Sequence, residues 1–156
     1  MGITYDYPEQ MNDQSRILED VISFVLGLGA KKIILVGASR GGVASIKVAA
    51  RNVESRNIVG IVAFSAPIEY EGSVFYSKEE LGSIKIPKLL INSENDDGAK
   101  DNRKMFEMLR EPKRLQFYPG DAHGTELFNK ERELITKQLQ DFIESVLDTE
   151  IYQIGK

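Results

Sequence analysis

The sequence predicts an α/β domain with a mostly parallel sheet. Short apolar runs, each long enough for one strand, alternate along the chain with longer stretches in which apolar residues follow helical spacing. These short runs are apolar throughout, which is typical of strands that are buried on both faces of a sheet. Right-handed crossovers would place helices on both faces, so we expect a three-layer α/β/α sandwich with about five strands.

Each expected element rests on a local pattern. The first strand is short and β-prone, and Pro8 ends it. Asn12 or Asp13 can cap the helix that follows, and Gly29 is well placed to stop it. The second helix is rich in small residues, which suits close packing on a sheet. The expected order is a strand at residues 2–7, a helix at about 12–28, a strand at 31–37, a helix at 42–53, strands at 58–67 and 88–94, a helix at 99–111, a strand at 114–120 and a helix at 126–147.

Composition and charge narrow the class of protein. The 156 residues suit one domain that spans positions 1–156, and 42% hydrophobic with 28% charged residues is ordinary for a globular chain. The net charge is -4 and no basic block occurs, which argues against a nucleic-acid surface. The absence of cysteine excludes disulfides, thiolate metal sites and a cysteine nucleophile.

The sequence contains no recognisable signal that would direct the protein to a membrane or out of the cell. No apolar run approaches the roughly 20 residues that a membrane span requires. The first ten residues lack the basic start and apolar stretch of a signal peptide. We therefore expect a soluble, cytoplasmic protein with no membrane partner.

The stretch "GASRG" at residues 37–41 is the most specific motif in the chain. Ser39 has a glycine at both second neighbours, Gly37 and Gly41, and stands between an expected strand and an expected helix. This is the G-x-S-x-G pattern of a nucleophile elbow, in which glycines leave room for a sharp turn and the serine hydroxyl is lifted away from the sheet. A glycine-rich turn or a helix-capping serine is the alternative interpretation.

Two further segments should lie beside Ser39, because the carboxyl ends of parallel strands share one edge of the sheet. "NSENDDG" follows the third apolar strand and offers Glu94, Asp96 and Asp97 as carboxylates. "PGDAHG" follows the fourth and contains His123, the one histidine in the chain. An imidazole can take the proton of a serine and return it, and a carboxylate can orient that imidazole.

The order serine, acid, histidine on successive strand ends resembles the α/β-hydrolase superfamily, in particular its dienelactone-hydrolase-like and esterase-like members. The segments "VGASRGG", "PKLLINSENDDG" and "FYPGDAHG" carry the resemblance, which covers roughly residues 30–148. It implies Ser39 as nucleophile, Asp96 rather than Asp97 as the acid, and His123 as the base. It also implies the backbone N–H of Arg40 as an oxyanion donor, and no metal or organic cofactor.

The resemblance departs from the family at the front of the chain. Family members usually have three or four strands before the elbow, whereas 38 residues precede Ser39 here. No upstream segment offers an obvious second oxyanion donor. We expect either that residues 2–7 pair directly with the strand at 31–37, or that two copies of the chain form a homodimer at that sheet edge.

The sequence thus predicts a serine hydrolase that acts on a carboxylic ester or a related small acyl substrate through Ser39, His123 and Asp96. The alternative is a non-catalytic module, derived from a hydrolase, that binds a ligand or a partner chain. Phe75 and Tyr76 lie where this family often builds a cap, and either could face a substrate or pack in the core.

Overall fold

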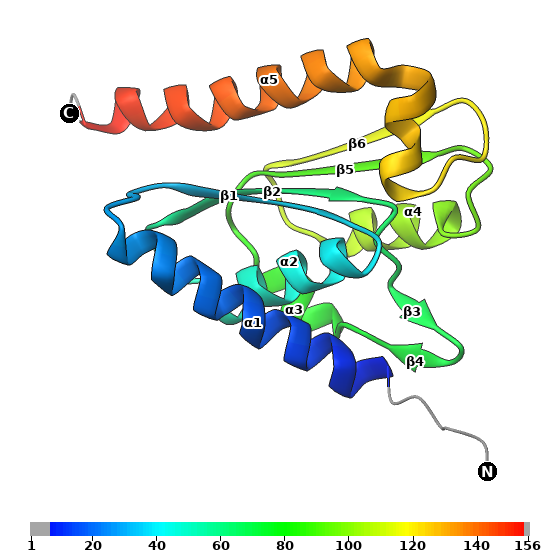
Figure 1. Ribbon diagram of the computed structural model, residues 1–156, viewed down its shortest axis with the longest axis horizontal. Helices are drawn as coiled ribbons and strands as arrows, with labels where there is room; N and C mark the ends of the chain where they lie inside the picture. Colours follow the sequence, from blue (N-terminus) through cyan, green and yellow to red (C-terminus); the bar gives the residue numbers. More distant parts are fainter. Residues whose placement is uncertain (1–6, 155–156) are drawn as a thin grey trace.

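The computed structural model describes residues 7–154. Four parallel strands form the main sheet in the order β1-β2-β5-β6, and helices cover both of its faces (Figure 1). The elements are α1 (Tyr7–Gly27), β1 (Ile33–Ala38), α2 (Arg40–Arg51), β2 (Ile58–Phe64), β3 (Glu69–Tyr70), β4 (Ser73–Val74), α3 (Lys78–Ser83), β5 (Lys88–Ser93), α4 (Ala99–Met108), β6 (Lys113–Tyr118), the short 3-10 helix η1 (Gly124–Glu126) and α5 (Leu127–Ile154).

The two faces of the sheet bury different clusters. All seven residues of β2 are buried, and they alternate between the faces. Ile61 and Ala63 pack in a cluster with residues of α1, α2, α3 and α4, whereas Val62 and Phe64 pack with residues of α5. The expected three-layer sandwich is confirmed.

The N-terminal helix starts earlier than the sequence indicates. α1 begins at Tyr7, so Pro8 lies in its first turn, where proline is tolerated because the N–H that it lacks would have no partner there. The expected cap at Asn12 or Asp13 was therefore wrong. Gly29 has a φ of 99°, the left-handed conformation that ends helices. The expected strand at residues 2–7 lies outside the described residues, apart from Tyr7.

A hairpin that the sequence did not predict follows β2. β3 and β4 pair antiparallel, and both residues between them, Glu71 and Gly72, have positive φ (48° and 79°). Two positive φ values in succession are the signature of a tight hairpin turn. The hairpin stands beyond the carboxyl edge of the sheet, on the side where the strand ends meet (Figure 1).

β1 lies at one end of the sheet. Within residues 7–154 it pairs with β2 alone, and Val36 is 55% exposed. Beside it, exposed apolar residues of α1, together with Leu28 directly after its end, follow helical spacing and form what we call the α1 stripe: Ile17, Val21, Phe24 and Leu28. Among the described residues, no helix is long and apolar enough to cross a membrane.

Candidate active site

Ser39 occupies a strained turn between β1 and α2. Its φ of 51° and ψ of -119° are rare for a residue with a side chain. The backbone N–H of Ser39 donates to the Phe64 carbonyl at 2.8 Å, which fixes the turn to the end of β2. A sharp turn from a strand into a helix, with a serine in strained backbone geometry, is also the arrangement found in nucleophile elbows.

Close backbone contacts at the turn explain why glycine is needed at Gly37, but not at Gly41. A Cβ at Gly37 would collide with the backbone of Gly41 and come within 2.6 Å of the Gly42 nitrogen, so only glycine fits. Gly41 is different, because a Cβ there would meet nothing within 4 Å. The second close approach is at Gly42, where a Cβ would lie 2.8 Å from that of Ala66. Outside the backbone of α2 itself, no crowding requires glycine at Gly41, and the second crowded position is the next one.

His123 and Asp96 form a hydrogen-bonded pair. Nδ1 of His123 lies 3.1 Å from both carboxylate oxygens of Asp96, so Nδ1 carries the proton when the imidazole is neutral. The Asp96 side chain is 4% exposed and that of His123 is 49% exposed. Nε2 is then the nitrogen with a free lone pair, as a general base requires.

The structure distinguishes among the three carboxylates of the acid loop. Glu94 and Asp97 are exposed, and within the described part of the chain neither pairs with His123. Asp96 is buried and also accepts a hydrogen bond from the Gly98 backbone at 3.2 Å. Its position and its partners therefore suit the role of orienting the imidazole.

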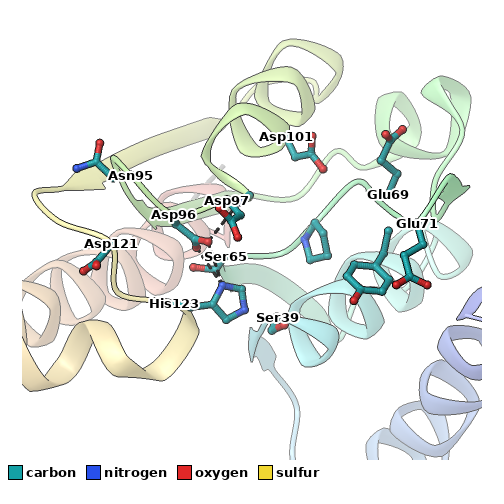
Figure 2. A pocket seen from close by; sticks show the side chains of 13 residues that line it. Ser39, Ser65, Glu69, Glu71, Asn95, Asp96, Asp97, Asp101, Asp121 and His123 are labelled. Carbon is teal, nitrogen blue, oxygen red and sulfur yellow. Dashed lines mark hydrogen bonds and ion pairs between the residues drawn. The ribbon is translucent and has the colours of Figure 1, made fainter.

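Ser39 and His123 line the same cavity, of about 750 Å³. The His123 ring lies between Asp96 and Ser39 (Figure 2). No hydrogen bond joins the Ser39 hydroxyl to His123 in the part of the chain that the structure describes. Such bonds are often long in a free enzyme and shorten when substrate binds.

This larger cavity is strongly acidic. No lysine or arginine is among its lining residues, and six of them carry carboxylates: Glu69, Glu71, Asp96, Asp97, Asp101 and Asp121. The Lys130 ammonium, which donates to Asp121 at 3.2 Å, lowers the pKa of that carboxyl. Across residues 7–154, no cluster of three or more side chains suits a metal ion.

A second cavity of about 300 Å³ adjoins Ser39 on another side. Apart from Ser39 and Arg40 its lining is mostly apolar: Met11, Pro67, Tyr70 and Phe75. Phe75 therefore faces the site, although it also belongs to the core. Tyr76 is not among the lining residues; it packs in the core, and burial raises the pKa of its hydroxyl well above the usual value.

Arg40 supplies a backbone donor next to Ser39. It is the first residue of α2, so its N–H has no partner within the helix. No backbone acceptor elsewhere in the described chain takes this N–H either. It is thus available to an anion that forms beside Ser39.

Sequence analysis missed one residue of the site. Ser65 follows β2 directly, has a φ of 45° and lines the larger cavity together with Ser39 and His123. A serine after a strand looks like any turn residue, and the sequence holds no signal that separates the two.

Comparison with known proteins identifies a family. The sequence model of the PhoPQ-activated pathogenicity-related protein family matches residues 26–151, which is most of the chain. No curated protein matches the chain significantly.

Solved structures show the fold. The chain is similar to a predicted CIB-like hydrolase from Thermoplasma acidophilum, with a TM-score of 0.68, 18% identity, and coverage of 86% of this chain and 60% of that one. It is similar to dienelactone hydrolase from Anabaena variabilis, with a TM-score of 0.56, 25% identity, and coverage of 70% of this chain and 46% of that one. It is also similar to MGS-MChE2, an α/β hydrolase from the metagenome of lagoon sediments at Mar Chica, Morocco, with a TM-score of 0.70, 16% identity, and coverage of 86% of this chain and 70% of that one. The α/β-hydrolase resemblance is confirmed, and the chain spans 60% of the first of these proteins.

Proposed function

Because this chain belongs to the PhoPQ-activated pathogenicity-related protein family and has the α/β-hydrolase fold, we propose that it is a serine hydrolase of carboxylic esters or related acyl compounds. The observation that carries the proposal is the His123–Asp96 hydrogen bond in the cavity that Ser39 lines from a strained elbow. A structural turn would need neither a buried carboxylate on the imidazole nor a strained serine beside it.

The proposed reaction gives each of these groups a role. The Ser39 oxygen forms a bond to the acyl carbon while Nε2 of His123 takes the hydroxyl proton. Asp96 accepts from Nδ1 and stabilises the imidazolium, and the Arg40 N–H stabilises the negative oxygen of the tetrahedral intermediate. The bond to the leaving group then breaks, and the leaving oxygen takes the proton from Nε2. Water, deprotonated by Nε2 of His123, then attacks the acyl carbon of the acyl-enzyme. The bond between that carbon and the Ser39 oxygen breaks, the Ser39 oxygen takes the proton back from Nε2, and the carboxylic acid leaves.

The two cavities beside Ser39 suggest the kind of ester. The smaller, mostly apolar cavity of about 300 Å³ suits a short hydrocarbon portion, which would gain about 25 cal/mol for each Å² removed from water. The larger, acidic cavity suits a neutral or cationic portion, because a substrate carboxylate there would face six carboxylates. We therefore propose small, uncharged or cationic esters as substrates.

A fluorophosphonate probe tests the proposal, because it phosphonylates only an activated serine. We expect stoichiometric labelling of the parent protein, no labelling of Ser39→Ala, and labelling of His123→Ala slowed by about 10²–10⁴-fold. Ser23→Ala is the matched control, since the Ser23 hydroxyl is exposed and bonds only within α1. A parent protein that stays unlabelled contradicts the proposal and favours a non-catalytic binding module.

A further inference from the structure

Ser65 is strained and buried, as a residue with a specific task would be. It is 1% exposed, and its positive φ places a non-glycine residue in the left-handed region. Ser39, which follows the neighbouring strand β1, shares this kind of backbone. Strain of this kind persists only where surrounding contacts determine the conformation.

The hydrogen bonds of the Ser65 hydroxyl account for the strain. The Ser65 oxygen accepts from the backbone N–H of Gly124 at 3.0 Å, and its proton goes to the Asn92 side-chain oxygen at 2.7 Å. That oxygen of Asn92 also accepts from the Ser93 N–H at 2.8 Å, which fixes its orientation. With its single proton committed to Asn92, Ser65 has none to donate to a substrate.

The segments that carry the candidate triad all meet at the end of β2. The Phe64 carbonyl accepts from Ser39 N–H, and the Ser65 N–H donates to the Ile91 carbonyl at 2.9 Å, in the strand that leads to the acid loop. The Ser65 hydroxyl reaches Gly124, which directly follows His123. One pair of residues, 64 and 65, therefore bonds to the nucleophile turn, the acid strand and the histidine loop.

A second buried serine holds the other side of His123. The Ser93 hydroxyl donates to the Ala122 carbonyl at 2.6 Å, and Ser93 is itself fully buried. The backbone is thus anchored on both sides of His123, at residue 122 by Ser93 and at residue 124 by Ser65. Because the His123 side chain is half exposed, packing alone does not fix its ring. Asp96, the two serine anchors and the Glu126 carboxylate, which accepts from the His123 N–H at 3.3 Å, hold it in place.

We propose that Ser65 is a positioning residue for the His123 general base, with Ser93 as its counterpart on the opposite side of the loop. Ser65 acts through the Gly124 N–H and does not touch the substrate. The inference rests on the proposed function for its catalytic meaning, but the anchoring itself can be measured without any activity.

The one imidazole of the chain gives a direct readout. In protein with isotope-labelled histidine, the ring resonances of Ser65→Ala should move toward those of Asp96→Ala, in which the ring has lost its carboxylate. Ser65→Gly should shift the ring resonances as far as Ser65→Ala does. Because glycine adopts the left-handed backbone without strain, Ser65→Gly should also fold at least as readily as Ser65→Ala. Ser15→Ala is the matched control, because Ser15 is fully buried but bonds only to the Met11 carbonyl within α1. Its histidine resonances should coincide with those of the parent.

Fluorophosphonate labelling adds the catalytic readout. We expect both Ser65 variants to label between about tenfold and a hundredfold more slowly than the parent, since a misplaced base costs that much, and Ser15→Ala to label at the parental rate. Histidine resonances of Ser65→Gly that coincide with the parent's would overturn the positioning role, as would parental labelling by both variants. If the parent does not label at all but Ser65→Gly still displaces the ring, the serine-hydrolase function fails and the positioning role stands.

Discussion

Replacing Gly37 by alanine tests whether the elbow has the geometry described. The added methyl would overlap the backbone of Gly41 and lie 2.6 Å from the Gly42 nitrogen, closer than the 3.0 Å that real Cβ atoms respect. Both neighbours are backbone, so no side chain can move aside. The first turn of α2 must shift away from β1, and it takes the Arg40 N–H and Ser39 with it.

The cost of that shift can be estimated. Forcing an extra methyl into a packed interior costs about 1–3 kcal/mol. For a domain of this size each kcal/mol lowers the melting temperature by about 2–4 °C, so Gly37→Ala should melt about 2–12 °C below the parent. If Ser39 is the nucleophile as proposed, its displacement by a fraction of an ångström should slow fluorophosphonate labelling by about tenfold or more.

Gly41→Ala is the matched control for stability. Its methyl would meet nothing within 4 Å, and the position lies in the first turn of α2. Alanine is favoured over glycine in helices by about 0.5–1 kcal/mol, so Gly41→Ala should melt at or slightly above the parent temperature. The reasoning is refuted if Gly37→Ala melts and labels like the parent, or if Gly41→Ala loses as much stability as Gly37→Ala.

Three further predictions concern pH, association and charge. Burial lowers the pKa of Lys88 from 10.5 to about 8. Between these two pH values the unfolded chain binds more protons than the folded one, so rising pH should raise the melting temperature of the parent relative to that of Lys88→Met. Melting temperatures of the two proteins that change in parallel over this pH range would contradict the prediction. Within residues 7–154 no strand pairs with β1 on the side away from β2, so this edge and the α1 stripe should make the chain self-associate in sedimentation experiments. The double variant Phe24→Glu, Val36→Lys should sediment as a monomer, and a parent that stays monomeric at high concentration would speak against the prediction. Because the larger cavity is acidic, neutral and cationic esters should react faster than matched esters that carry a carboxylate. Added salt screens the charges and should reduce this difference in rate. Equal rates would show that the acidic cavity does not contact the substrate.

The strands and the candidate triad could be predicted because their signals are local or depend only on chain order. A parallel strand buried on both faces is an apolar run, so β2 and β5 stand out in the sequence. The carboxyl ends of parallel strands share one edge, which is enough to bring Ser39, Asp96 and His123 together.

The features that were missed depend on tertiary contacts or on one or two residues. The β3–β4 hairpin has two residues in each strand, too few for a periodic pattern. Ser65 bonds to Gly124 across 59 positions of the chain, and nothing in the residues around either one indicates the other. The crowding that distinguishes Gly42 from Gly41 comes mainly from Ala66, two residues after β2, and this contact likewise exists only once the chain is folded.

The hydrogen bonds at the strand ends show whether the site depends on the side of β1 that has no partner strand within residues 7–154. Ser39 is bonded to the end of β2, His123 to Asp96, and the loop around His123 to Ser65 and Ser93. Every one of these contacts lies within β1, β2, β5, β6 and the turns that follow them. Strands added at the free side of β1 would not be needed to hold the three side chains in place. What such an addition could still supply is a second oxyanion donor, whose loss typically costs about 10²–10³-fold in rate. Under the proposed function, the positions of Ser39, Asp96 and His123 therefore depend on the described residues alone, whereas the rate of turnover depends also on a second oxyanion donor.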